Sequence, residues 1–130
     1  MFVLFHAGLD NGLPDPIHCP PHRLAKMLDN FPDLIVIAAH MGSYRMWDEV
    51  RDTLCGRDLY FDTSFAHKHL GNAGMVALIK EHGIDKILFG SDLPWDDQTG
   101  QVAMIHKLSL TREDRGKILY HNAQDVLGLS

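Results

Sequence analysis

The sequence predicts an α/β fold of four successive βα units with parallel strands. Four short runs rich in β-branched and aromatic residues alternate with segments whose apolar residues recur at helical spacing. The second run, 34–40, is apolar at nearly every position, which is typical of a strand covered on both faces in a parallel sheet. The runs end at His6, His40, Ser64 and Asp92, at intervals close to the roughly 30 residues of one βα unit.

The first unit begins with a strand over Phe2–His6. A loop that contains several prolines follows, and Pro20 and Pro21 then open a helix, because a proline at the first helical position loses no hydrogen bond. Pro32 ends this helix. The residues of its apolar stripe are Leu24, Met27, Leu28 and Phe31.

The second and third units repeat this order. Ser43 is expected to cap the helix after the second strand, and Gly56 to end it, since glycine favours the left-handed conformation found after helices. The third strand covers Leu59–Phe65 and is followed by a helix that ends at Gly83. The residues expected on the buried sides of these two helices are Trp47, Val50, Leu54, Met75, Leu78 and Ile79.

The fourth unit has its strand at Lys86–Asp92, which Pro94 stops. A helix carrying Val102, Ile105 and Leu108 follows. Thr111 and Asn122 are expected to cap two short final helices, because each has an aspartate three residues later, as in a capping box. The whole chain is expected to form one domain.

Composition excludes several classes of protein. The chain has 130 residues and a formal net charge of −5 at pH 7, with 45% apolar and 22% charged residues. The apolar fraction is too high for a disordered segment, and the acidic balance argues against nucleic acid or an anionic membrane as the partner. No apolar run approaches the roughly 18 residues of a membrane span. No secretory signal is visible, and the two cysteines lack metal-site spacing, so a cytoplasmic location is expected.

Polar residues follow the apolar part of each strand. His6, His40 and Asp92 end three different strands, and the carboxyl ends of parallel strands meet at the edge of the sheet where ligands bind. Imidazole and carboxylate are the usual ligands of catalytic divalent metals, which activate water. The alternative is that each histidine is merely hydrogen-bonded in place and that Asp92 is a turn residue. The joint placement favours the metal site.

Weaker candidates lie in the loops and helices. His67-Lys68-His69 would direct two imidazoles to one side if extended, although a solvated loop is the alternative. Trp95 either walls a substrate pocket or seals the end of the sheet. Arg45 is a candidate to hold a substrate carboxylate, with a solvated arginine as the alternative. His82 is expected on the surface of its helix.

Several of these segments resemble known motifs. The run LFGSDLPW at 88–95, AHMG at 39–42, FHAG at 5–8 and YFDTS at 60–64 resemble the last four strand motifs of the amidohydrolase-related proteins, and the C-terminal tail resembles their ending. That family includes aminocarboxymuconate-semialdehyde decarboxylase-like and 2-pyrone-4,6-dicarboxylate lactonase-like enzymes. The resemblance implies that this chain is the C-terminal half, four βα units, of a TIM (β/α)8 barrel.

The resemblance also implies roles for the site residues. His6 would be a metal ligand, Asp92 a metal ligand or the base that takes the proton of water, and His40 a neighbour that orients water or stabilises an oxyanion. The ion would be Zn²⁺, with Mn²⁺ also used in the family. The substrate would be a small carboxylated or cyclic compound.

The chain departs from the family pattern at its start. The H-x-H motif of the family's first strand has no counterpart before His6. An arc of four strands also exposes unpaired edges, which a second copy of the chain or a separate N-terminal half-barrel would cover, unless the chain refolds as an open sheet. Three functions stay open: a metal-dependent hydrolase, which is the first expectation, a metal-dependent non-oxidative decarboxylase, and a non-catalytic half-barrel that only oligomerises.

Overall fold

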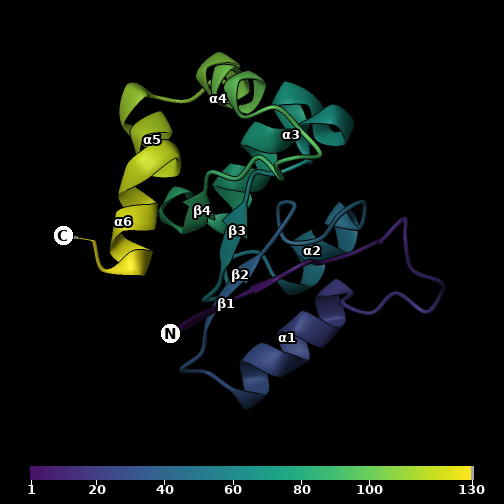
Figure 1. The fold of residues 1–130 in the computed structure, drawn as a ribbon. Helices are drawn as coiled ribbons and strands as arrows, with labels where there is room; N and C mark the ends of the chain where they lie inside the picture. The colour runs from purple at the N-terminus through teal and green to yellow at the C-terminus, as the bar shows by residue number, and fades with distance from the viewer. Residues whose placement is uncertain (130) are drawn as a thin grey trace.

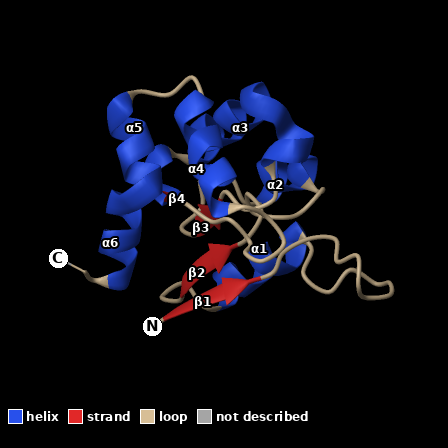
Figure 2. Ribbon diagram, turned by 45° about the horizontal axis from the view of Figure 1, so that its top comes forward, coloured by secondary structure: helices blue, strands red, loops and turns tan. Residues whose placement is uncertain are grey.

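The computed structural model describes residues 1–129 and contains a four-stranded parallel sheet. The strands lie in chain order, β1-β2-β3-β4, and every pair is parallel (Figure 2). Their bounds are β1 (Phe2–Phe5), β2 (Ile35–Ala38), β3 (Tyr60–Asp62) and β4 (Ile87–Leu88). The predicted α/β class and parallel order are therefore confirmed, but each strand is shorter than predicted. The residues expected to end the strands lie in the loops that follow them.

The helices form an arc around the sheet, from α1 beside β1 and β2 to α5 and α6 beside β4 (Figure 1). The helical segments are α1 (Pro21–Asn30), α2 (Trp47–Thr53), α3 (His67–His82), η1 (Ile84–Lys86), α4 (Gln98–Lys107), α5 (Arg112–Gly116), η2 (Lys117–His121) and α6 (Asn122–Leu127). Within residues 1–129, no helix combines the length and the apolar character that crossing a bilayer requires.

The two faces of the sheet differ in cover. Val36, Phe61 and Ile87 alternate onto the face that packs against the helices, and each is fully buried. Phe2 and Leu4, on the opposite face of β1, are 42% and 58% exposed. Cover on both faces was predicted for the whole second strand, and it holds from Val36 onward but not at Ile35. The open face lies at the β1 side of the sheet.

Two of the three predicted caps are wrong. Thr111 does cap α5, since its Oγ1 accepts the N–H of Asp114 at 3.0 Å. Ser43 lies in the loop after β2, and α2 begins only at Trp47. Asn122 continues the helical path of η2, and its side-chain amide donates to the carbonyls of Ile84 and Ile87, both at 2.8 Å.

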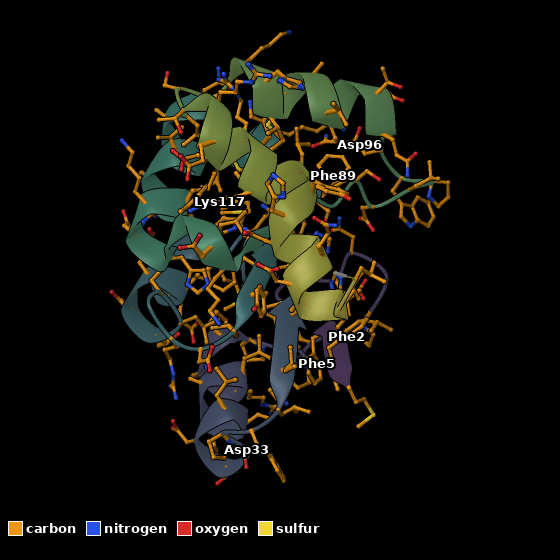
Figure 3. All side chains as sticks on the ribbon, turned by 90° about the vertical axis from the view of Figure 1, so that its left-hand side faces the viewer. Phe2, Phe5, Asp33, Phe89, Asp96 and Lys117 are labelled. Atoms are coloured by element: carbon orange, nitrogen blue, oxygen red, sulfur yellow. The ribbon has the colours of Figure 1, made fainter. Side chains whose placement is uncertain are left out.

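The C-terminal helices are held along β4. The N–H of Phe89 donates to the carbonyl of Ile118 in η2 at 2.9 Å, and Figure 3 looks onto this packed segment, with Phe89 labelled beside it. Together with the two bonds from Asn122, this contact ties the last helix to the end of the sheet.

His82 is buried, although the sequence led us to expect it on the helix surface. Its ring stacks on Phe61, with 3.7 Å between ring centroids. Its Nδ1 accepts the N–H of Gly56 at 3.2 Å, and its Nε2 donates to the carbonyl of Leu59 at 2.9 Å. Burial lowers the pKa of His82 to about 4, so the ring is neutral in the core at pH 7.

Candidate functional site

Two histidines meet where β1 and β2 end. His6 is the first residue after β1 and His40 lies two residues after β2, and the register of the two strands brings them side by side. The Nε2 atom of His40 is 3.1 Å from the Nδ1 atom of His6, with the rings edge to face. His40 is only 4% exposed, whereas the side chain of His6 is 49% exposed.

Asp92 lies on the walls of the same two cavities as this pair. The larger cavity, of about 530 Å³, is lined by His6, Leu9, Asp10, Asn11, Gly12, His40, Tyr44, Phe65, Asp92 and Trp95. The smaller, of about 270 Å³, is lined by Leu4, His6, Ala39, His40, Asp62, Ser64, Gly90 and Asp92. The fold thus brings together the three residues that the sequence singled out. Their roles stay predictions.

The backbone at this edge is strained. His40, Phe65 and Asp92 follow three different strands, and all have left-handed φ angles, of 61°, 54° and 60°. Each such residue costs on the order of 1–3 kcal/mol and persists only where the surrounding structure enforces it. Strain of this kind is concentrated at functional sites, and here it marks the same edge as the cavities.

The ring of His40 is held from the side of β3. Its Nδ1 lies 3.1 Å from both the carbonyl oxygen and the Oγ of Ser64. Ser64 Oγ in turn donates to Asp62 Oδ1 at 2.5 Å. The sequence pattern places Asp62 and Ser64 at the end of the third strand and predicts no contact between them and His40. Their function could not be read from spacing, because the contacts depend on how β2 and β3 are aligned.

Three contacts join His6 and His40 to each other and to two backbone carbonyls. His6 Nε2 lies 3.2 Å from the carbonyl of Leu9, His6 meets His40, and His40 meets the carbonyl of Ser64. Two neutral imidazoles carry two ring protons for these three contacts, and both ends of this series of contacts are carbonyls that only accept. When each ring donates to its own carbonyl, the lone pairs of His40 Nε2 and His6 Nδ1 face each other, and this pair of nitrogens fits a bound cation.

The described residues alone do not enclose such an ion. Among residues 1–129, no three His, Cys, Asp or Glu side chains lie close enough together to hold a metal. Two imidazole nitrogens and the carboxylate of Asp92 border the cavities, but they supply only part of a ligand set.

An aromatic cluster forms one wall of the larger cavity. The Tyr44 hydroxyl lies 3.1 Å from His69 Nε2, and the Tyr44 ring packs edge-on against His40 and Phe65. Trp95 is 76% exposed and also lines this cavity, and its role as a wall of a substrate pocket stays a prediction. The sequence pattern missed Tyr44 and Phe65, since aromatic residues in loops carry no periodic signal.

Two other candidates lie elsewhere. Arg45 is exposed and lines neither of the two cavities. His67-Lys68-His69 is not extended, because it forms the first turn of α3. His67 Nε2 pairs with Asn72 Oδ1 at 2.6 Å, while His69 pairs with Tyr44. The two imidazoles therefore do not act as a pair, and neither joins His6 and His40.

Comparison with known proteins places the chain in a wider group. A family model described as Amidohydrolase matches residues 5–129. A gamma-resorcylate decarboxylase of Polaromonas sp. (strain JS666) is 30% identical in an alignment of 121 positions that covers 80% of this chain and 37% of that protein.

Solved structures share the fold. A dihydroxybenzoic acid decarboxylase from Polaromonas sp. JS666, with bound manganese and the inhibitor 2-nitroresorcinol, matches 84% of this chain and 39% of its own at 26% identity and a TM-score of 0.67. An uncharacterised TIM-barrel protein of Bordetella bronchiseptica matches 96% of this chain and 44% of its own at 22% identity and a TM-score of 0.73. The chain spans less than half the length of each of these relatives, and its sheet is a partial barrel.

Proposed function

The chain belongs to the amidohydrolase family, and from that premise we propose that it carries part of the active site of a divalent-metal-dependent, non-oxidative decarboxylase of a small hydroxylated aromatic acid. The observation that carries the proposal is the cavity where His6, His40 and Asp92 meet an aromatic wall. Its volume of about 530 Å³ suits a ligand with one aromatic ring. The Polaromonas relatives, decarboxylases by name, support the reaction class.

The residues of this chain divide the work as follows. His6 and Asp92 would hold the ion, with Asp92 alternatively moving the proton that replaces carbon dioxide on the substrate. When bound, the ion supplies positive charge that holds substrate oxygens and stabilises negative charge. His40 lies against His6, and Trp95 with the aromatic cluster excludes water from the substrate ring. Manganese in a relative supports Mn²⁺ as the ion, and Zn²⁺ stays an expectation.

The remaining ligands and strands would come from another polypeptide segment. β1 is an edge strand of the described sheet, and its outward residues Phe2 and Leu4 are exposed. A second copy of the chain or an N-terminal half-barrel would cover this edge and complete the site. Arg45, on the exposed loop beyond His40, stays a candidate for a substrate carboxylate only in such an assembly. A cytoplasmic location stays a prediction.

Hydrolysis, the first expectation from the sequence, also stays a prediction. We give decarboxylation precedence because the two Polaromonas relatives carry that activity in their names.

Metal content tests the site. The chain, purified without chelator and dialysed against Mn²⁺, is compared with the variants His6→Ala and Asp92→Ala. His106→Ala is the matched control, because His106 is exposed on α4. We expect the wild type and the control to retain manganese and both site variants to lose it. Equal manganese in all four proteins would remove the metal site from the proposal.

Product analysis tests the reaction. The native species that contains this chain is incubated with γ-resorcylate and Mn²⁺, and carbon dioxide is measured. Release that disappears with His6→Ala supports the decarboxylase. A hydrolytic product from a lactone or amide panel, without carbon dioxide from the acid, would support the hydrolase instead. No turnover by any species that binds metal would favour the non-catalytic half-barrel.

A further inference from the structure

Asp62, the last residue of β3, is a hydrogen-bond hub between two strand ends. Its Oδ1 accepts three bonds: from the backbone N–H of His40 at 3.0 Å, from the backbone N–H of Ser64 at 2.9 Å and from Ser64 Oγ at 2.5 Å. One carboxylate oxygen thus fixes the loop after β2 to the loop after β3. The short bond to Ser64 also commits the only hydroxyl proton of that residue.

That commitment decides which nitrogen of His40 carries a proton. Two groups face Nδ1 of His40 at 3.1 Å, the carbonyl oxygen and the Oγ of Ser64. The carbonyl can only accept, and the hydroxyl, having donated to Asp62, offers His40 only its lone pairs. A bare Nδ1 would therefore confront two acceptors, whereas a protonated Nδ1 satisfies both. Both His40 and Ser64 are buried, so water cannot relieve the conflict.

The other ring nitrogen is then free of a proton. Nε2 of His40 points at Nδ1 of His6 across 3.1 Å. The backbone of His40 is fixed as well, because its carbonyl accepts the indole N–H of Trp47 at 3.0 Å while Asp62 holds its N–H. The residue held in this way has a left-handed φ of 61°. The ring therefore presents one lone pair, in one direction, to the cavity.

We infer that Asp62 is a positioning residue that fixes His40 in the Nδ1–H tautomer by keeping the hydroxyl proton of Ser64 away from the imidazole. The inference uses only contacts within this chain. Its catalytic consequence, an Nε2 ready to accept a proton or to face a bound ion, rests on the proposed function. The tautomer itself does not, so the two can fail separately.

Nitrogen-15 NMR of the histidine rings tests this on the full chain without metal or substrate, at a pH well above the ordinary histidine pKa. His82 is the internal reference, since its Nε2 donates to Leu59 and its Nδ1 accepts from Gly56. We expect the two buried histidines to show opposite patterns, with His40 protonated at Nδ1 and His82 at Nε2. A His40 protonated at Nε2 in the wild type would overturn the inference.

Three variants separate positioning from general loss of structure. In Asp62→Ala the hydroxyl of Ser64 is released and can donate to Nδ1, so we expect the His40 signals to move toward the opposite tautomer while those of His82 stay in place. Ser64→Ala leaves the carbonyl as the only partner and keeps the Nδ1–H form. The double variant Asp62→Ala with Ser64→Ala removes the competing hydroxyl and restores that form.

The conservative variant completes the test. Asp62→Asn retains an oxygen that accepts from the N–H groups of His40 and Ser64, and we expect it to keep the wild-type tautomer. Unchanged His40 signals in a folded Asp62→Ala protein would overturn the role of Asp62. Failure of the double variant to restore the Nδ1–H form, with His82 unmoved, would overturn the competition mechanism. Neither result depends on whether the chain decarboxylates anything.

Discussion

The two sides of the candidate site differ in how completely this chain builds them. Around His40 and Ser64, at the ends of β2 and β3, the polar groups are buried and paired with one another. Around His6 and Asp92, at the ends of β1 and β4, the side chains border open cavities, and the described residues form no group of three His, Cys, Asp or Glu side chains that could hold a metal. The first region is complete within the described residues, whereas the proposed function requires an ion and further chain at the second.

The largest expected effect tests the region around His40 and Ser64, where the polar groups are buried and paired. Asp62→Ala leaves the N–H groups of His40 and Ser64 without their acceptor, and each lost partner costs roughly 1–3 kcal/mol, so we expect a destabilisation of about 4 kcal/mol. Asp92→Asn, in the open region, keeps a residue that tolerates left-handed φ and should change stability by less than about 0.5 kcal/mol. Urea unfolding measures both. Similar losses in the two variants would erase the contrast.

A pH series tests the buried His82 of the core. Burial lowers the pKa of His82 to about 4, below the value of about 6.5 in the unfolded chain. The unfolded state therefore binds more protons between these values, and stability rises with pH from about 4 to 6.5 and is fully present above 6.5. We expect about 3 kcal/mol across this window.

The variant His82→Gln isolates the contribution of His82 to the pH dependence of stability. Glutamine can still donate and accept but does not titrate, so the slope of stability between these pH values should flatten. Urea unfolding at a series of pH values provides the measurement. An unchanged slope would assign the pH dependence to other groups.

Metal addition tests the region around His6 and Asp92. If His6 and Asp92 hold an ion, Mn²⁺ at a hundredfold excess over its dissociation constant stabilises the chain by about 2.7 kcal/mol. We expect His6→Ala to lose this gain and Asp62→Asn to keep it. Thermal unfolding with and without Mn²⁺ measures the change in stability. A gain that persists in His6→Ala would indicate that the ion binds elsewhere.

The smallest stability effect is expected at Trp95. This side chain is exposed, so Trp95→Ala should leave the free energy of unfolding within about 0.5 kcal/mol of the wild type. Binding of an aromatic acid to the native species should weaken, because the indole lines the cavity. Calorimetric titration with the aromatic acid measures this loss of affinity. Unchanged affinity would return Trp95 to a role at the end of the sheet.

Much of the fold followed from local patterns in the sequence. The four βα units and the meeting of His6, His40 and Asp92 could be predicted because parallel strands place their carboxyl ends at one edge. The burial of His82 could also have been predicted, because this residue continues the helical stripe of Met75, Leu78 and Ile79 at the right spacing. The polarity of histidine outweighed that signal in the interpretation, which was therefore wrong.

The rest depended on contacts between segments. The bonds from Asp62 to His40 and Ser64 require the alignment of β2 with β3, which no spacing along the chain specifies. The alternatives for His67-Lys68-His69 were an extended segment and a solvated loop, but the segment forms the first turn of α3, which begins at His67. Loops and helix starts are set by tertiary contacts, and here they decide the neighbours of the site.

The exposed apolar residues of β1 have a practical consequence for handling this chain. An edge strand with bare N–H and C=O groups and protruding Phe2 and Leu4 can recruit strands from other molecules into growing, poorly soluble assemblies. A lysine in place of Phe2 would act as a gatekeeper against such growth while lying away from the lining of both cavities. Dilute samples, or co-expression with whatever caps that edge, should preserve a dispersed preparation.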